Sequence, residues 1–301
     1  MNINGNNVDI FYDLIDEACM KLYEDIHLDY LDGFIRVTSD ILDHFDDSML
    51  SDEAIESLKN IYEKIFALNI LNEEIRFALT LIVIKGLKHR NLPLDIITPD
   101  TIGYLFTYIV DILGKGNKSS IIDTCLGVSA LSQTIVNNAE NVNIIGIEKE
   151  ELYVKVAKSI SDLLDNDVKI YFQNPSQVIY DVADFVIGDL GRIDDVYEVV
   201  LERLPNLKDN GYFIYLIDND FFSKTDNGFK RSLDKEATLT GLIVLPDNFT
   251  NASHVGKSIL IGKKAVLDNY HMSILKIDSF DKETINETFS KVKKMIQQME
   301  G

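Results

Sequence analysis

Polar side chains follow four short apolar segments in the middle of the chain. Asp123 and Glu148 end the first two segments, Gln173 and Asn174 follow the third, and Asp189 ends the fourth. The carboxyl ends of parallel strands meet at one edge of a sheet, where ligands bind near the switch point. An acid after the second strand can accept hydrogen bonds from ribose hydroxyls, and amides can pair with an adenine edge. Together the strand ends predict a ligand crevice.

One glycine stands in the turn after the first of these segments. Gly127 would let the backbone approach a ligand closely before the next helix, and Glu148 follows it by about 20 residues, as in dinucleotide-binding folds. Taken singly each feature is weak, because a lone glycine after a strand is more often a turn and a strand-end acid more often a helix N-cap. Four polar strand ends in register are a better indication than any one of them.

Two other cofactor motifs do not fit the sequence. The GxGxxG fingerprint is absent, because only Gly127 occupies the turn. The run 114–120 resembles a phosphate-binding loop by composition, but it precedes a strand and lacks the GxxxxGK[ST] spacing. We therefore interpret this run as a loop.

Cysteine and histidine usage argues against a metal site. The only cysteines, Cys19 and Cys125, form no CxxC or Cys/His spacing, and the five histidines are scattered. Two cysteines give no disulfide framework, which fits a reducing cytoplasm. Cys125 on its own reads as a small packed side chain.

The net charge and the lengths of the apolar runs limit the kinds of partner that the protein can have. The net charge of −20 opposes binding to a phosphate backbone, so nucleic acid would be reached through a local basic patch or a partner subunit. No run of about 18 apolar residues indicates a membrane span, and residues 1–9 do not resemble a secretory signal. We expect a cytoplasmic protein with no membrane association.

The chain divides into two regions by the period of its apolar residues. Residues 1–92 form an acidic region with apolar residues at three- and four-residue spacing, which predicts helices, and Ser51 is placed to cap one of them. In residues 93–301 short β-branched runs alternate with helical segments, which predicts an α/β fold with a mostly parallel sheet covered on both faces. The expected strands are 120–123, 142–147, 168–172, 185–187, 212–217, 242–245, 257–263 and 272–277. The expected helices of this region are 128–138, 150–164, 195–204, 229–237 and 282–299.

Several segments in order along the chain resemble those of a known family. Ile97-Thr98-Pro99-Asp100 resembles a Thr-Pro-Asp segment ahead of strand one, and Asp123 to Gly127 resembles an Asp-Pro-x-x-Gly-Thr-Gly loop. The runs 241–249 and 257–260 match late segments of the same family. The chain thus resembles the YtxK-like class I S-adenosylmethionine-dependent methyltransferases, small relatives of type I restriction-modification adenine methyltransferase subunits. The resemblance covers roughly residues 70–264.

The resemblance implies a fold, a cofactor and a set of site residues. The implied fold is a Rossmann-like methyltransferase domain at 93–301, with a mostly parallel seven-stranded sheet and helices on both faces, plus an all-α domain at 1–92. The implied cofactor is S-adenosylmethionine, and the implied activity is methylation of an adenine amino group in DNA. By resemblance the cofactor-binding residues are Thr98, Pro99, Asp123, Cys125, Gly127, Glu148, Gln173 and Asn174.

The sequence departs from the family where the chemistry is expected. Thr124 and Ser129 replace a proline and a glycine of the cofactor loop, and Asn174 replaces an acid. In the wider family, strand four ends in an acid or amide that, with a backbone carbonyl, orients the target amine, followed by two prolines and an aromatic. The small relatives end this strand in Asp-Leu-Pro-Val-Gly. Here it ends Asp189-Leu190-Gly191-Arg192, without the prolines and the aromatic. Asp189 and Leu190 are the catalytic candidates, in a degenerate member of the family, although Asp189 could equally cap the following helix.

Two functions remain open at this point. The first is an active methyltransferase that acts on an amino group of nucleic acid or of a smaller acceptor. The second is an inactive protein of the same fold that binds the cofactor or a protein partner, with the N-terminal helices as a surface for self-association. His254 and Lys257 are further candidates to line the acceptor side, although a lone histidine beside a glycine is more often a solvated loop residue.

Overall fold

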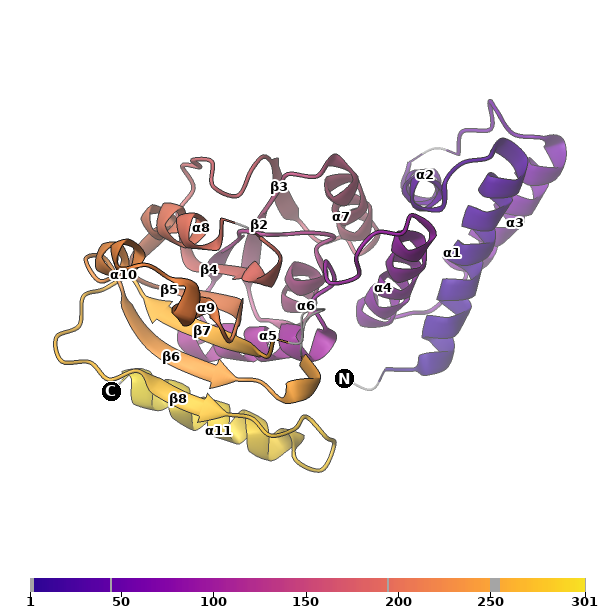
Figure 1. Ribbon diagram of the computed structural model, residues 1–301. Coiled ribbons are helices and arrows are strands. Elements are labelled where there is room, and N and C mark those ends of the chain that lie inside the picture. The colour runs from indigo at the N-terminus through magenta and orange to yellow at the C-terminus, as the bar shows by residue number, and fades with distance from the viewer. Residues whose placement is uncertain (1–2, 44, 194, 250–254, 301) are drawn as a thin grey trace. The chain divides into compact units, whose positions relative to one another are not determined.

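The computed structural model of the protein describes residues 3–43, 45–193, 195–249 and 255–300 (Figure 1). Contacts divide the chain into two compact units. The helical unit comprises Met1–Ile97, Gly127–Ser129 and Glu150–Asp167, and the sheet unit comprises the remaining residues. The helical unit therefore draws residues from two later parts of the chain in addition to the predicted N-terminal region.

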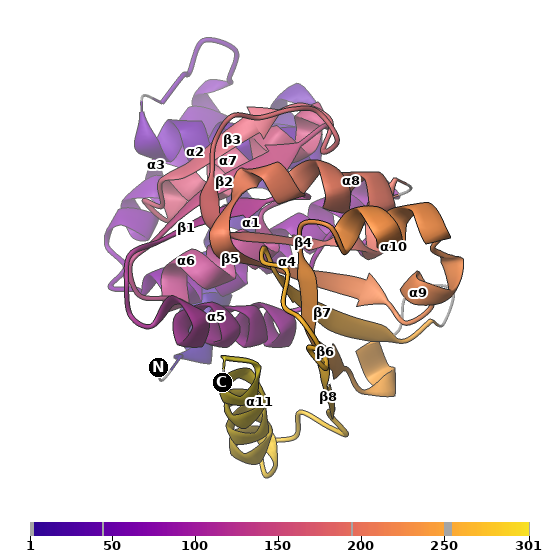
Figure 2. The same ribbon diagram turned by 90° about the vertical axis from the view of Figure 1, so that its left-hand side faces the viewer.

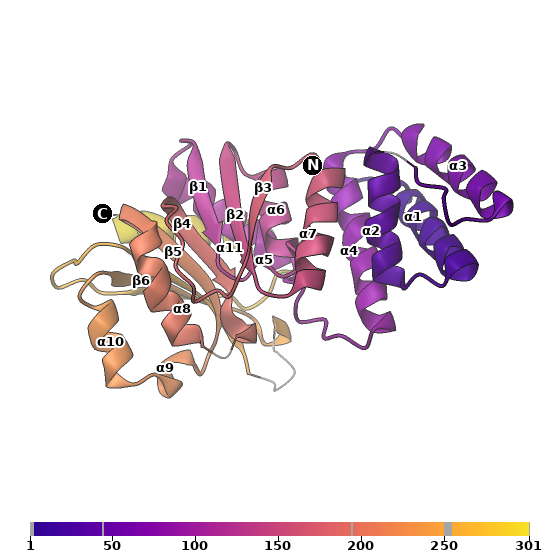
Figure 3. The ribbon, with the colours of Figure 1, turned by 90° about the horizontal axis from the view of Figure 1, so that it is seen from above.

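The described part of the helical unit is built from five helices. Four come from the N-terminal region and the fifth, α7, comes from between two strands; they are α1 (Gly5–Ile26), α2 (Tyr30–Leu42), α3 (Asp52–Phe66), α4 (Asn72–His89) and α7 (Glu151–Leu163). Within this unit α7 packs against α2 and α4 (Figure 3). The core buries the periodic apolar residues, for example Leu22, Phe34 and Leu79.

Polar caps set the beginnings of these helices. The Ser51 hydroxyl accepts the N–H of Ala54 at 3.2 Å, which confirms the predicted cap of α3. Asn4 caps α1, and the Glu74 carboxylate in turn accepts the N–H of Asn4 at 2.8 Å and the side-chain amide of Asn7 at 2.9 Å. The first turn of α1 is thereby tied to α4.

In the described residues, the sheet unit contains one twisted sheet of eight strands (Figure 1). Its strands are β1 (Ser119–Asp123), β2 (Val142–Glu148), β3 (Val168–Phe172), β4 (Ala183–Asp189), β5 (Leu207–Asp218), β6 (Thr238–Val244), β7 (Lys257–Lys263) and β8 (Ser273–Lys276). The spatial order is β3-β2-β1-β4-β5-β7-β6-β8, and only the two pairings of β7, with β5 and β6, are antiparallel. The mostly parallel sheet is confirmed. The β-branched runs predicted eight strands and the resemblance implied seven; the eighth, β8, pairs with β6 and extends the edge.

Helices cover both faces of this sheet (Figure 2). One face packs against α5 (Asp100–Gly114), α6 (Ala130–Asn138) and α11 (Ile285–Glu300). The other packs against α8 (Val196–Arg203), α9 (Phe221–Lys224) and α10 (Asn227–Leu233). Neighbouring residues of a strand alternate between these layers, as Ile121 and Ile122 of β1 do. The helix α5 was not among the expected elements.

The strand order reverses between β1 and β4. The chain proceeds from β1 outward to β2 and β3, then returns to β4 on the other side of β1. In open α/β sheets a crevice outside the carboxyl ends of the strands forms at such a switch point. The topology therefore places the ligand site of the sheet unit next to the ends of β1 and β4.

Candidate functional site

The predicted acids stand on three adjacent strands at one edge of the sheet. Asp123 of β1 is in register with Gly146 of β2 and with Ile187 of β4. Glu148 and Asp189 each lie two residues beyond those partners, at the ends of their strands. The fold thus brings Asp123, Glu148 and Asp189 to the carboxyl edge, and all three are nearly buried.

Asp123 organises the turn that follows β1. Its carboxylate accepts the N–H of Cys125 at 3.1 Å and the hydroxyl of Ser132 in α6 at 2.7 Å. The Cys125 side chain is buried among apolar residues beneath α8. Asp123 therefore fixes the path of the backbone from β1 toward α6. A ligand at the end of β1 would approach this turn.

Thr124, which replaces the proline of the family, joins the ends of β1 and β4. Its N–H and its hydroxyl both donate to the carbonyl of Ile187, at 2.9 and 3.0 Å. Gly188 makes room for this side chain, because a Cβ there would lie 2.5 Å from Thr124 Oγ1. The replacement is accommodated by two bonds that a proline could not form.

The end of the same turn keeps a backbone shape that favours glycine. Gly127 has φ of 57° and Ser129 has φ of 66°, both in the left-handed region. The Ser129 hydroxyl is fully buried and, within the described residues, has no hydrogen-bond partner. Buried polar atoms are normally paired, so this hydroxyl is an exception to that pattern. By its contacts this segment belongs to the helical unit.

Strands β2 and β3 end in a buried acid and an exposed turn. Glu148 is 7% exposed, and its backbone carbonyl accepts the N–H of Gln173 at 2.9 Å. The Asn174 side-chain oxygen accepts both the N–H and the hydroxyl of Ser176 at 3.0 Å. This turn uses the Asn174 oxygen locally, so its amide N–H groups are what Asn174 can offer an adenine.

The Thr-Pro segment lies against the end of strand four. Pro99 precedes α5, and its carbonyl accepts the N–H of Ile102 at 2.9 Å. Thr98 is buried, and its hydroxyl donates to Asp189 Oδ2 at 3.3 Å. Two residues predicted for different roles, one for the cofactor and one for catalysis, are therefore in contact.

Asp189 is 3% exposed and has donors of the chain on both oxygens. Besides Thr98 on Oδ2, the N–H of Gly191 donates to Oδ1 at 3.3 Å and Lys257 Nζ lies 3.7 Å from Oδ1. Leu190 points into the apolar core, and its carbonyl accepts the N–H of Ile193 at 3.4 Å. Asp189 thus caps the short helix that begins at Leu190, the alternative role considered for it, and also meets a cation.

Asp218, at the end of β5, is a further acid that the sequence reasoning missed. It is in register with Lys257 of β7, and Lys257 Nζ lies 3.5 Å from its Oδ1. Asp218 carries the same signal as the first four strands, namely a polar residue at the end of an apolar strand. His254, the other acceptor-side candidate, lies outside the described residues.

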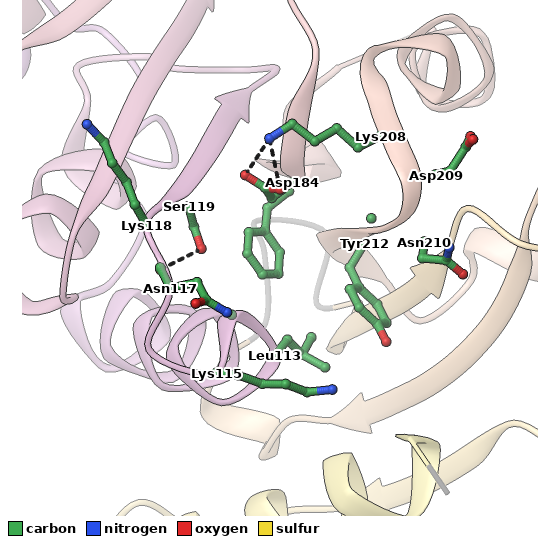
Figure 4. Close-up of a pocket in the computed structure, with 13 residues that line it drawn as sticks. Leu113, Lys115, Asn117, Lys118, Ser119, Asp184, Lys208, Asp209, Asn210 and Tyr212 are labelled. Carbon is green, nitrogen blue, oxygen red and sulfur yellow. Dashed lines mark hydrogen bonds and ion pairs between the residues drawn. The ribbon is translucent and has the colours of Figure 1, made fainter.

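A hollow lies at the opposite, amino edge of the sheet (Figure 4). It has a volume of about 260 Å³ and is lined by the starts of β1, β4 and β5. The ammonium groups of Lys115, Lys118 and Lys208 point in different directions, and that of Lys208 pairs with Asp184 at 3.0 Å. Because the cations diverge, this hollow does not form a convergent anion site.

The described residues lack both a metal-binding cluster and a membrane-spanning helix. They contain no group of three or more His, Cys, Asp or Glu side chains placed to hold a metal ion. Among the helices built from them, none is both long and apolar enough to cross a membrane.

Solved structures with the same fold define the class of the sheet unit. A Listeria monocytogenes protein proposed to be a class I S-adenosylmethionine-dependent methyltransferase superposes with a TM-score of 0.83 at 22% identity, covering 97% of this chain and all of that chain. The type I restriction-modification methyltransferase subunit of Streptococcus thermophilus superposes with a TM-score of 0.62 at 14% identity, covering 97% and 75%. The chain has the fold of the class I S-adenosylmethionine-dependent methyltransferases.

Sequence comparison identifies a family of helical domains and a relative of similar length. The family model of the YtxK N-terminal helical domain matches residues 9–87. The YtxK protein of Bacillus subtilis (strain 168) is 24% identical over 268 residues, which are 80% of this chain and 82% of YtxK. The chain carries a YtxK-like helical domain and is a homologue of YtxK, and the predicted resemblance is confirmed.

Proposed function

We propose that the protein binds S-adenosylmethionine at the carboxyl edge of β1, β2 and β4 and transfers its methyl group to an amino group. The observation that carries the proposal is the alignment of Asp123, Glu148 and Asp189 on adjacent strand ends at the switch point of the sheet.

Each residue has a distinct part in this proposal. Glu148 accepts hydrogen bonds from the ribose hydroxyls, and Gln173 and Asn174 pair with the adenine. Asp123 and Gly127 hold the turn that the cofactor approaches, with Cys125 packed beneath it. Thr98 and Pro99 border the site from the start of α5. The cofactor supplies an electrophilic methyl group on a sulfonium.

Asp189 is the residue that orients the acceptor. A carboxylate that accepts hydrogen bonds from an amine fixes the direction of the nitrogen lone pair, which is a positioning effect. The Leu190 carbonyl, the second acceptor expected by resemblance, already accepts the N–H of Ile193. A carbonyl oxygen has two lone pairs, so the Leu190 carbonyl can still accept a second hydrogen bond beside Asp189. The resemblance suggests an adenine amino group in DNA as the acceptor.

One observation favours a second candidate, a protein that binds the cofactor without transferring the methyl group. Both oxygens of Asp189 already meet donors of the chain, namely Thr98, Gly191 and Lys257. An acceptor amine must compete with these donors. If it cannot, the fold serves as a cofactor-dependent interaction module, and the helical unit is its contact surface.

Calorimetric titration with S-adenosylmethionine and S-adenosylhomocysteine tests the proposal. Wild-type protein is expected to bind both, and Glu148→Ala to weaken binding by about 1–3 kcal/mol, because ribose hydroxyls lose a buried acceptor. Glu150→Ala, which removes an exposed acid two positions away, is the matched control. No heat from folded wild-type protein would contradict cofactor binding and both candidates that depend on it.

Partners and compartment complete the proposal. The charge of −20 favours contact with nucleic acid through a partner subunit over direct contact. Self-association through the N-terminal helices is the proposed homodimer, which sedimentation of residues 1–301 would detect. A chain with only two cysteines, both buried, suits the cytoplasm, where thiols stay reduced.

A further inference from the structure

Lys257 lies between two carboxylates at the edge of the sheet where the acceptor is proposed to bind. Its Nζ is 3.7 Å from Asp189 Oδ1 and 3.5 Å from Asp218 Oδ1, and 14% of its side chain is exposed. The three residues come from the ends of the adjacent strands β4, β5 and β7. Two carboxylates with one ammonium leave a negative balance, so the cluster attracts cations.

Gly191 leaves the space that the ammonium occupies. A Cβ on Gly191 would overlap Lys257 Nζ and lie 3.2 Å from Asp218 Oδ1. The space that the Lys257 ammonium occupies therefore borders the backbone of Gly191, in the segment that follows strand four. Lys257 Nζ is the far end of a flexible four-carbon chain, so a second ammonium can take its place without a change in the backbone.

We propose that the methyl acceptor is a primary alkyl amine, bound as its ammonium ion between Asp189 and Asp218 in place of Lys257. This rests on the proposed methyltransferase function and names the substrate class of the same site. An enzyme that methylates a flipped base stacks it on an aromatic side chain, and the segment Asp189-Leu190-Gly191-Arg192 contains none. The charge of −20 repels a phosphate backbone and attracts cationic amines.

One of the two carboxylates accepts the proton that the substrate ammonium loses before methyl transfer. The bound ammonium gives one proton to a carboxylate, and from there the proton passes to solvent. The nitrogen lone pair then forms the new C–N bond while the C–S bond breaks, and the bonding pair of electrons stays on sulfur. The products are a secondary ammonium ion and the neutral thioether.

Binding of butylammonium to the full chain tests the site without any cofactor. Lys257→Met removes the resident ammonium and leaves an apolar chain of similar length. The variant is expected to bind butylammonium chloride at least roughly tenfold more tightly than wild type, and butylammonium is expected to raise its Tm. Adding Gly191→Ala to the variant fills the space and is expected to remove the gain. Tetramethylammonium has the same charge but no N–H donors, and it should not reproduce the effect.

Equal affinity of wild type and Lys257→Met for butylammonium overturns the proposal. So does a gain that survives Gly191→Ala. Should Lys257→Met fail to fold, Lys257→Gln is used, because it keeps a polar group beside the carboxylates and removes the charge, while its side chain ends one atom short of the ammonium position. Lys257→Gln is expected to bind butylammonium more tightly than wild type does, as Lys257→Met is. Equal affinity of Lys257→Gln and wild type counts against the site.

Transfer of a labelled methyl group separates this inference from the proposed function. Wild-type protein with methyl-labelled S-adenosylmethionine is expected to label butylamine and to leave the adenines of an oligodeoxynucleotide unlabelled. Label on adenine overturns the alkyl amine and supports the proposed function. Absence of S-adenosylmethionine binding overturns the proposed function, while the butylammonium titration still decides whether the amine site exists.

Discussion

The Thr98 hydroxyl donates to Asp189 Oδ2 across 3.3 Å, although 91 positions separate the two residues in the chain. Thr98 immediately precedes the Pro99 cap of α5, and Asp189 ends β4, which adjoins β1 in the sheet. Both side chains are buried, so this hydroxyl helps to compensate the removal of a carboxylate from water. The start of α5 and the strand-four acid therefore form one local structure.

Thr98→Val is expected to lower the free energy of unfolding. The variant keeps the shape of the side chain but leaves Asp189 Oδ2 without this donor, at a cost of about 1.5–3 kcal/mol for a bond to a charged group. Urea-induced unfolding measures the change, and Thr98→Ser, which keeps the hydroxyl, is the control. Identical midpoints for Val and wild type would show that water replaces the hydroxyl at no cost.

Thr124→Pro, which restores the residue of the family, is expected to destabilise the protein by about 1–3 kcal/mol. Proline removes both the N–H and the hydroxyl that donate to the Ile187 carbonyl, and a buried carbonyl then loses its two donors. Thr124→Val keeps the N–H and the branched shape, so its loss should be smaller. The order of unfolding free energies, wild type above Val above Pro, is the checkable result; Pro equal to wild type would contradict this account.

The sequence was sufficient for the elements whose signal is local. The β-branched runs identify all eight strands, and Ser51 identifies the start of α3, because both signals lie within a few neighbouring residues. The helix α5 carries the same kind of signal, with Ile102, Phe106 and Ile109 on one face, and its first residue also belongs to the Thr-Pro-Asp segment of the family resemblance.

Long-range pairing limits what could be predicted of the site. The meeting of Lys257 with Asp189 and Asp218 depends on the antiparallel register of β7 against β5, in which Asp218 faces Lys257. A shift of one residue would turn each side chain to the opposite face. Nothing in the local sequence states that register, so the ammonium beside the strand-four acid emerges only from the structure.

The pKa of Glu74 gives the stability of the helical unit a dependence on pH. Hydrogen bonds from the Asn7 side chain and from the N–H groups of Asn4 and Leu71 hold this pKa below its ordinary value. A carboxyl whose pKa is lower in the folded state stabilises above its unfolded pKa, and that stabilisation is lost as pH falls through the folded pKa. We expect Tm to fall less between about pH 5 and 3 in Glu74→Gln than in wild type.

Thermal unfolding by circular dichroism across that range measures the difference. Glu56→Gln is the matched control, because Glu56 is exposed on α3, and it should follow the wild-type curve. Parallel curves for Glu74→Gln and wild type would contradict the role of Glu74 in holding the first turn of α1.

Two glycines of the helical unit should respond in opposite directions to the same substitution. A Cβ on Gly86 of α4 would overlap the Leu31 side chain of α2, with Leu31 Cγ at 2.6 Å, whereas a Cβ on Gly33 of α2 would make an ordinary contact of 3.6 Å with the Cys19 carbonyl. Gly86→Ala is expected to destabilise by about 1–3 kcal/mol through overpacking. Gly33→Ala is expected to stabilise by about 0.5–1 kcal/mol, because alanine loses less backbone entropy in a helix. Urea unfolding of both variants checks the pair, and a stabilised Gly86→Ala would mean that α2 and α4 do not pack this closely.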